Sequence, residues 1–156
     1  VHVRPSFIWG PRGRERSAFS PLPALVHAAA RGSSAGTGAD PTARAPVHAG
    51  DGYDICYVKD CGHAIALVQT APRLSHAVYN VGSGRVTTNA EVVAAIRAHV
   101  PDFDIELVEG RGESAPATDP VLDLARIRQE TGYEPAYDTE AAVGDYLAWL
   151  HAGHDR

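Results

Sequence analysis

The chain has 156 residues, of which 44% are hydrophobic and 21% charged, and its formal net charge is −5. This balance predicts one globular domain and excludes an intrinsically disordered chain. The negative charge argues against nucleic-acid and membrane partners, and no apolar run reaches the roughly 18–20 residues of a membrane-spanning helix.

The first fourteen residues, VHVRPSFIWGPRGR, predict a strand that ends at Gly10-Pro11. Its β-branched and aromatic side chains favour burial on both faces, as in a parallel sheet. Pro5 removes a hydrogen-bond donor near the middle of the strand. A buried strand that ends in such a turn typically brings side chains and backbone to a ligand at the carboxyl edge of the sheet.

The sequence LPALVHAAARG at residues 22–32 predicts a helix with Gly32 as its C-cap. Residues 32–46 contain few large apolar side chains and are predicted to form a flexible loop. Within it, Gly32, Gly36 and Gly38 have a spacing that resembles the phosphate-binding turn of dinucleotide-binding proteins. That turn requires a strand directly before it and a helix directly after it, so a surface loop is favoured over a nucleotide-binding module.

Three further short strands are predicted, over residues 53–58, 76–81 and 105–108. Alternation in the first of them places its side chains on two faces. These are Ile55 and Tyr57 on one face, and Cys56 and Val58 on the other. Asn80 lies near the end of the second strand, before Gly82-Ser83-Gly84, where its amide is expected to bond loop backbone rather than to act in catalysis.

Asp60 stands at the expected N-cap of the helix that follows residues 53–58, and this role is favoured over a catalytic one. Cys56 and Cys61 are the only cysteines. Two cysteines without secretory context stay reduced more often than they form a disulfide, which favours a cytoplasmic protein. Asp60 and His63 lie near them, but no second ligand pair has metal-site spacing, so no metal site is predicted.

Three helices are predicted in the second half of the chain. Thr88 and Glu91 have the spacing of a capping box before an amphipathic helix. Asp123 is expected to cap the next helix, which ends at Gly132, and Thr139 is expected to cap the last one. The inward face of the last helix is predicted to hold Val143, Tyr146, Leu147 and Leu150. The order of these elements predicts α/β architecture with parallel connections.

Four segments occur in order along the chain: RPSFIWGP, YVKDCGHAIALV, VYNVGSGRVTTNAEVVAAI and LDLARIRQETGYEPAYDTEAAVGDYLAWL. They resemble the R-P-x-N-V-Y-G-P, V-D-D-V-A-x-A, Y-N-V-G-S-G-x-x-x-T-x-x-E and D-x-x-K-A-x-x-x-L-G-(W/Y)-x-P segments of the NAD(P)-dependent epimerase/dehydratase family, the extended short-chain dehydrogenases/reductases. The four matches follow the family's order and spacing and cover nearly the whole chain.

The resemblance implies a partial Rossmann-type sheet, made of its last parallel strands, together with the family's small α/β substrate-binding region. Residues 1–156 would then be the C-terminal part of such a protein, without its N-terminal cofactor-binding half. The family's glycine-rich turn is absent from this sequence, and so is its Tyr-x-x-x-Lys pair. Lys59 is the only lysine, and Ile55 stands four residues before it. In the family the lysine lowers the pKa of the tyrosine that exchanges a proton, so we predict no catalytic residue and no turnover by this chain alone.

The cofactor implied by the resemblance is NAD or NADP, although this chain alone is not expected to hold it. Pro5 and Ser6 would lie beside the nicotinamide carboxamide. The alternative is that Pro5 only ends strand pairing and Ser6 caps a turn. The implied partners are a small-molecule substrate and either the missing N-terminal half or a second copy of the chain.

The resemblance also assigns substrate positions. Phe7 stands where sugar-nucleotide members carry an Asn that contacts the substrate phosphate, and Tyr53 stands where many carry an Arg that pairs with the pyrophosphate. An aromatic ring supplies no charge-assisted donor, which favours a smaller or more apolar carbonyl or alcohol substrate. Arg12, Arg14 and Arg16 could compensate from the loop after the first strand.

Arg111 resembles the family's late substrate-binding Arg, with a spacing one residue short, and a solvated loop charge is the alternative.

Two classes of function follow. The first is the substrate-binding part of an epimerase, dehydratase or reductase acting on a sugar nucleotide or a small carbonyl or alcohol. The second is a non-catalytic binding or scaffold module with the same fold, which would use the unpaired side of the first strand.

Overall fold

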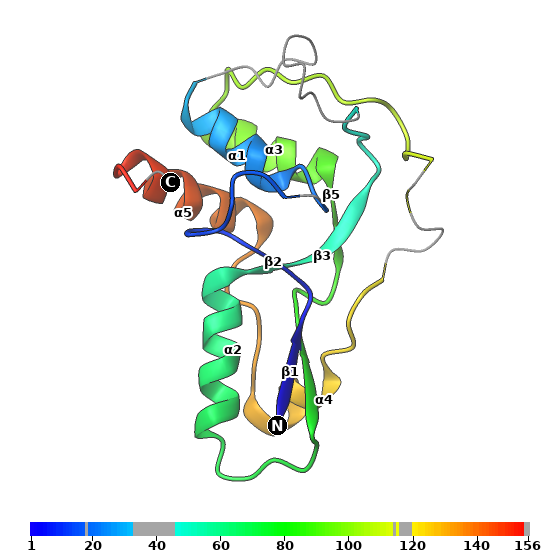
Figure 1. The fold of residues 1–156 in the computed structure, drawn as a ribbon, viewed down its shortest axis with the longest axis vertical. Coiled ribbons are helices and arrows are strands. Elements are labelled where there is room, and N and C mark those ends of the chain that lie inside the picture. The colour runs from blue at the N-terminus through cyan, green and yellow to red at the C-terminus, as the bar shows by residue number, and fades with distance from the viewer. Residues whose placement is uncertain (18, 33–45, 114, 116–119, 155–156) are drawn as a thin grey trace.

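The computed structural model describes residues 1–17, 19–32, 46–113, 115 and 120–154. The predicted loop at residues 32–46 therefore falls almost entirely outside the described residues. The elements occur in the order β1 (His2–Pro5), β2 (Phe7–Trp9), α1 (Leu22–Ala30), β3 (Gly52–Tyr57), α2 (Val58–Thr70), β4 (Val78–Val81), β5 (Val86–Thr88), α3 (Asn89–His99), α4 (Ala125–Thr131) and α5 (Thr139–His151) (Figure 1). This is the predicted α/β class.

The predicted first strand is divided at Ser6 into two strands with different partners. β1 pairs in parallel with β4, and β2 pairs in parallel with β3. Pro5 has no backbone N–H to give to a ladder, and the N–H of Ser6 donates to the carbonyl of Val81 at 2.8 Å. The chain leaves one partner strand at this point and joins the next. Burial on both faces was a wrong prediction for β1, because none of its four residues is buried.

β5 is a strand that the sequence analysis did not predict. It pairs antiparallel with the first half of β3, from Gly52 opposite Thr88 to Asp54 opposite Val86. The strand predicted at residues 105–108 is not formed in the described chain. A single parallel bridge joins His48 to Val108 there, so the segment pairs at one residue only.

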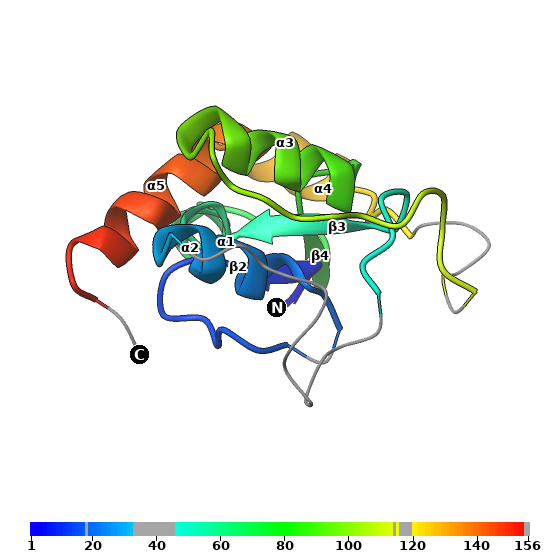
Figure 2. The same cartoon turned by 90° about the horizontal axis from the view of Figure 1, so that it is seen from above.

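Two hydrophobic clusters define two regions. The upper region consists of β2, β3 and β5 with α1, α3 and α5, and the three helices contact one another as well as the sheet (Figures 1 and 2). The lower region consists of β1, β4, α2 and α4. β3 contributes to both clusters, with Ile55 and Tyr57 in the upper one and Cys56 in the lower one. The predicted alternation is confirmed for Ile55, Cys56 and Tyr57, whereas Val58 was wrongly predicted to continue the strand and instead begins α2.

Some of the predicted helix ends are confirmed and others are wrong. Thr88 and Glu91 form the predicted capping box of α3, and Gly132, with φ +70°, ends α4. Thr139 does not cap α5. Asp138 takes that place, because its carboxylate accepts from the N–H of Ala141 at 2.8 Å.

Asp60 is not an N-cap either, because α2 already begins at Val58 and Asp60 lies within its first turn. Its buried carboxylate accepts from the N–H groups of Ala136 at 2.9 Å and Tyr137 at 3.2 Å. These two donors belong to the segment before α5. Asp60 therefore ties that segment to α2, a partner that local spacing cannot reveal. Within the described residues, the helices are too short and too polar for any of them to cross a membrane.

Candidate functional site

A groove of about 320 Å³ lies where the carboxyl end of β2 meets the loop that leads to α1. The loop runs along the outside of the molecule before it enters α1 (Figure 2). The groove is lined by Phe7, Ile8, Trp9, Gly10, Gly13, Arg14, Arg16, Ser17, Phe19 and Pro23. It combines large apolar side chains with two arginines.

The pairing of β2 with β3 brings two predicted substrate residues together. Phe7 stands opposite Ile55 in the parallel register, so its ring lies 6.1 Å from the ring of Tyr53. Trp9 is buried, and its ring makes an edge contact with the ring of Tyr57 at 5.2 Å. The inner side of the groove is therefore formed by residues of β2, and the rings of Phe7 and Trp9 contact aromatic rings of β3.

The turn after β2 depends on glycine. Gly10 has φ +128°, and a Cβ at this position would lie 2.7 Å from the Tyr57 ring and 2.8 Å from the side chain of Val58. Only a residue without a side chain allows the loop to leave the strand this close to β3 and α2. Gly10 thereby fixes where the loop begins.

The charged residues of the loop are arranged on two sides. Arg14 and Arg16 are exposed and line the groove, whereas Glu15 between them is half-buried and pairs with Arg31 at 2.7 Å. No acidic side chain lines the groove within the described part of the chain. The groove therefore suits a ligand with an anionic group and an apolar portion.

Arg12 and Arg111, the other two arginines predicted to contact substrate, lie outside the groove lining. Arg12 is exposed, has φ +66° and is not part of the groove lining. Arg111 lies beside Gly50 at the start of β3, in a segment held by a hydrogen bond from the N–H of Gly112 to Asp51 at 3.0 Å. The structure thus brings Phe7 and Tyr53 together and places Arg14 and Arg16 at the groove.

Pro5 and Ser6 lie at the carboxyl end of β1, next to a buried carboxylate. Asp54 accepts from the N–H and the hydroxyl of Ser83, both at 2.9 Å, and from the N–H of Leu122 at 3.0 Å. Gly82 packs against Asp54 and the Ser6 hydroxyl so closely that a Cβ there would lie within 2.9 Å of both. The Ser6 hydroxyl is buried and has no hydrogen-bond partner in the described structure. A buried hydroxyl without a partner at a strand end is suited to a ligand that supplies one.

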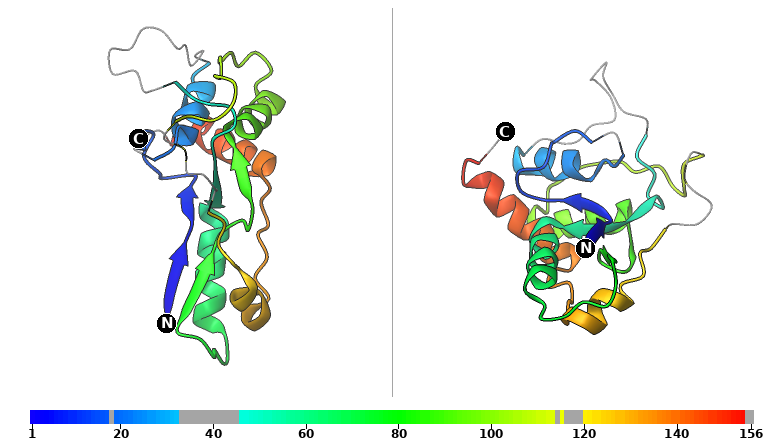
Figure 3. Two further views of the ribbon diagram at one scale, coloured as in Figure 1. Left: turned by 90° about the vertical axis from the view of Figure 1, so that its right-hand side faces the viewer. Right: turned by 60° about the horizontal axis from the view of Figure 1, so that its bottom comes forward.

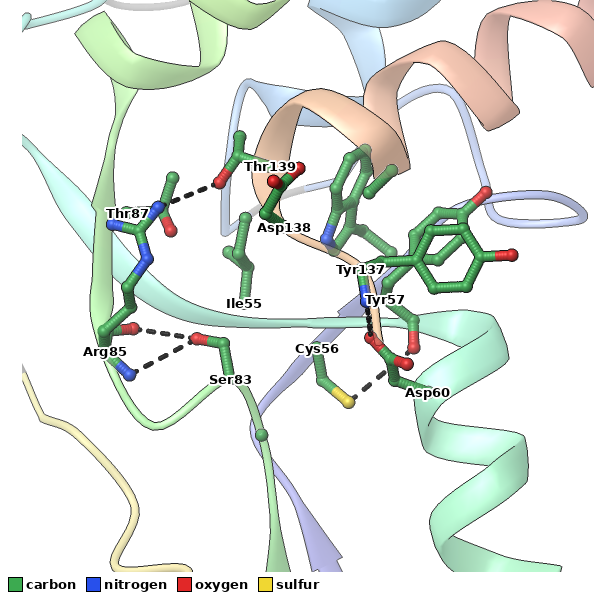
Figure 4. A pocket seen from close by; sticks show the side chains of 13 residues that line it. Ile55, Cys56, Tyr57, Asp60, Ser83, Arg85, Thr87, Tyr137, Asp138 and Thr139 are labelled. Carbon is green, nitrogen blue, oxygen red and sulfur yellow. Dashed lines mark hydrogen bonds between the residues drawn. The ribbon is translucent and has the colours of Figure 1, made fainter. Parts of the chain in front are cut away.

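A second, smaller cavity of about 30 Å³ lies between β3, the turn from β4 to β5 and the segment that leads into α5 (Figure 4). Its polar groups are already paired. The Arg85 guanidinium donates to the Thr139 hydroxyl at 3.1 Å, and Tyr137 donates its N–H to Asp60. This space accommodates about one water molecule.

Several buried titratable groups of the described chain have raised pKa values. Burial raises the pKa of Cys56 and of Cys61, which are both free thiols in the lower cluster. Burial, and then the hydrogen bond to Asp145, raises the pKa of Tyr57. These groups stay protonated at neutral pH and are poor nucleophiles or bases. Within the described residues, no group of three His, Cys, Asp or Glu side chains could hold a metal ion.

Comparison with known proteins gives consistent relatives. No family model matches the chain. The dTDP-glucose 4,6-dehydratase of Streptomyces griseus is 32% identical over 114 residues, which are 69% of this chain and 33% of the dehydratase. The structure of a UDP-glucose 4-epimerase of Thermotoga maritima with UDP-glucose superimposes with a TM-score of 0.73 at 19% identity, covering 98% of this chain and 46% of the epimerase.

A dTDP-glucose 4,6-dehydratase of Bacillus anthracis in complex with NAD gives a TM-score of 0.68 at 24% identity, covering 96% of this chain and 44% of that protein. The chain thus spans about a third of the curated relative and less than half of each solved structure. The fold is that of part of the NAD-dependent epimerases and dehydratases, and the sequence match to a dehydratase agrees with it. The resemblance inferred from the four motifs is confirmed.

Proposed function

We propose that this chain, which is related in fold and in sequence to part of the NAD-dependent epimerases and dehydratases, supplies the substrate-binding part of such an enzyme. The groove at the end of β2 is the observation that carries the proposal. It brings Phe7, whose ring contacts that of Tyr53, together with Arg14 and Arg16 at the carboxyl edge of parallel strands, where ligands of open α/β sheets bind. The substrate is a sugar nucleotide or a small carbonyl or alcohol.

The aromatic pair and the arginines favour different substrates within this proposal. The Phe7 and Tyr53 rings suit an apolar or flat group and supply no donors to a phosphate. Arg14 and Arg16 can supply charge-assisted donors from the loop instead. A substrate that has both an anionic group and an apolar portion would suit Phe7 and the two arginines that line the groove.

The cofactor of the complete enzyme would be NAD or NADP. Pro5 and Ser6 are proposed to face it, and the unpaired Ser6 hydroxyl fits this role because it has a hydrogen bond left to make. When bound, the nicotinamide would supply hydride transfer. The chain's own residues would bind and orient the substrate, whereas the glycine-rich turn and the Tyr-x-x-x-Lys pair would come from residues outside these 156. Residues 1–156 would act as one part of that enzyme.

The outer edge of β1 is the proposed place for the rest of the sheet. In the described structure β1 pairs only with β4, and its other edge lies at the margin of the molecule (Figure 3, left). A sheet edge with free N–H and C=O groups is a template for another strand. The same observation supports the second candidate, a scaffold module that binds a partner protein through β1.

The coding sequence directly upstream of residue 1 separates the two candidates. A glycine-rich turn and a Tyr-x-x-x-Lys pair within about 170 residues, roughly one domain length, would support the enzyme. Their absence would favour the scaffold module. In addition, the isolated 156-residue chain should show no NAD(P)H-dependent turnover with sugar nucleotides or small carbonyl compounds, and measurable turnover would contradict the proposal.

A further inference from the structure

The loop between β2 and α1 contains three consecutive charged residues, Arg14, Glu15 and Arg16, which do not all face the same part of the molecule. Arg14 and Arg16 line the groove, and Glu15 points toward α1. The Glu15 Oε1 atom accepts a hydrogen bond from Arg31 Nη2 at 2.7 Å. Arg31 is the C-cap of α1, so the ion pair joins the loop to the end of that helix.

The helix that receives Glu15 is itself fixed in the upper region. Glu15 Oε2 lies 4.0 Å from Nδ1 of His27, a buried residue of α1. The Nε2 atom of His27 is hydrogen-bonded to the Tyr146 hydroxyl of α5 at 2.9 Å. The hydrogen bond from Arg31 also lowers the pKa of Glu15, which keeps this carboxylate charged at neutral pH. The loop is therefore attached to a rigid pair of helices.

The loop's backbone hydrogen bonds are short-range by comparison. Gly13 donates its N–H to the carbonyl of Gly10 at 3.0 Å, and Phe19 donates its N–H to the Ser17 hydroxyl at 3.1 Å. Both span two or three residues, whereas the Glu15–Arg31 pair spans 16. The Glu15–Arg31 ion pair is therefore a long-range contact that attaches the middle of the loop to the end of α1.

We infer that Glu15 is a positioning residue that holds Arg14 and Arg16 toward an anionic group, a phosphate or a carboxylate, bound in the groove. Arg14 and Arg16 line the groove and Glu15 does not, so fixing Glu15 against α1 also restricts where the backbone can place its two neighbours. Glu15 itself does not touch the ligand. This inference rests on the proposed function, in which the groove takes the substrate.

Substitution of Glu15 distinguishes a positioning role from a purely electrostatic one, because the two roles predict changes of opposite sign in the affinity for an anion. Glu15→Gln removes a negative charge close to the groove, so long-range electrostatics alone would tighten the binding of an anion. Loss of positioning instead frees both arginines and weakens binding, because their side-chain entropy must then be lost on binding. The two explanations predict opposite changes.

The test is an NMR titration of the 156-residue chain with inorganic pyrophosphate, following backbone amides and arginine side-chain signals. Glu15→Gln and Arg31→Gln should each weaken pyrophosphate binding by about threefold to fivefold, the range expected for one exposed ion pair. The double variant should be no weaker than the weaker single variant, because both remove the same interaction. Glu15→Asp keeps the charge on a shorter side chain and should weaken binding by a smaller factor.

Glu134→Gln is the matched control, because Glu134 forms an exposed pair of 2.9 Å with Arg128 in the lower region. It should leave pyrophosphate binding unchanged. Tighter or unchanged binding by Glu15→Gln, with wild-type shifts still centred on the groove, would overturn the role of Glu15 but leave the groove as the anion site. Absence of pyrophosphate shifts at the groove of the wild-type chain would overturn both this inference and the anion site of the proposed function.

Discussion

The two regions of the molecule bury their strands to very different degrees. In the upper region, every residue of β3 except Tyr53 is buried, and Ile55 and Tyr57 belong to the same cluster as the buried side chains of α1, α3 and α5. In the lower region, α2 and α4 back the β1–β4 pair, and no residue of β1 is buried. The upper region therefore has a complete core, whereas the lower region has a sheet with one open edge (Figure 3). The difference indicates where further chain or a partner would be accommodated.

The regions also differ in how they are held together. The upper cluster is built of aromatic and aliphatic side chains, with Tyr146 contacting both Trp9 and Trp149. The lower region relies more on carboxylates that bind backbone N–H groups, such as Asp60. Apolar packing tolerates small movements, but charged hydrogen bonds depend on geometry and on pH. Mutations in the two regions should therefore have distinct signatures.

The largest expected effect is a loss of folding stability from two matched substitutions, each of which creates a cavity in one of the two regions. Ile96 in α3 and Ile127 in α4 are both fully buried, one in each cluster. Ile→Ala substitutions in cores cost about 2–5 kcal/mol. We expect Ile96→Ala near the top of this range and Ile127→Ala near its bottom, because the thinner lower region can collapse around the cavity. Urea unfolding of both variants measures this, and a larger loss for Ile127→Ala would contradict the comparison.

A smaller loss of folding stability is expected from substitution of Asp60, whose carboxylate joins α2 to the segment before α5. Asp60→Asn replaces one acceptor oxygen by an amide that cannot accept from Ala136 or Tyr137. Leaving a buried donor without its partner costs about 1–3 kcal/mol. The exposed Asp102→Asn is the control and should unfold like the wild type. Equal stability of the two variants would show that Asp60 does not hold this segment.

A pH-dependent effect is expected at Glu130, which accepts from the Tyr79 hydroxyl and the Ser75 N–H and also pairs with His76. These contacts, led by the Tyr79 hydrogen bond, lower the pKa of Glu130 below its ordinary value of 4.5. A carboxylate whose pKa is lowered in the folded state stabilises that state above pH 4.5. This stabilisation is lost as the pH falls through the folded-state pKa.

Glu130→Gln should therefore be less stable than the wild type at pH 7, and the difference should narrow as the solution is acidified below pH 4.5. Glu134→Gln provides the reference for a general charge effect. A difference that stays constant from pH 7 to pH 3 would indicate that the contacts of Glu130 do not depend on its charge.

The smallest effect needs no substitution. Cys56 and Cys61 are buried in the lower cluster, and burial raises the pKa of both thiols. Iodoacetamide should modify them far more slowly in the folded chain than in urea, because the thiolate is the reactive form. If the lower region opens on its own, both thiols should react together at a rate below that of the unfolded chain. Fast modification of the folded chain would mean that this cluster is not closed.

Local patterns in the sequence predicted much of this fold. The α/β class, the capping box at Thr88 and Glu91, and the two faces of residues 53–58 follow from spacing within a few residues. The end of α4 at Gly132 follows from the positive φ that glycine permits, whereas the C-cap of α1 is Arg31 and the predicted Gly32, also with positive φ, comes one residue later. These features need no knowledge of distant partners.

Most of the errors share one physical cause, which is a partner far along the chain; the cap of α5 is different, because Asp138 bonds Ala141 only three residues later. The break at Ser6 arises because β1 and β2 pair with different strands. β5 is only three residues long and forms because β3 offers a free edge, and the donors to Asp60 lie 76 and 77 residues away. At the groove, the sequence named Arg14 and Arg16 only as substitutes, because spacing cannot tell which side of a loop a charge faces.

β3 has one more consequence, for the order in which the molecule opens. Its successive side chains belong to opposite clusters, so it cannot leave the sheet without disturbing both. Regions that share a central element unfold as one cooperative unit, and amides in that element exchange last with solvent deuterium. The N–H groups of residues 55–57 should therefore be the slowest to exchange in the molecule, whereas those of β1 should exchange early. The strand that separates the two cores would then also be what makes them a single folding unit.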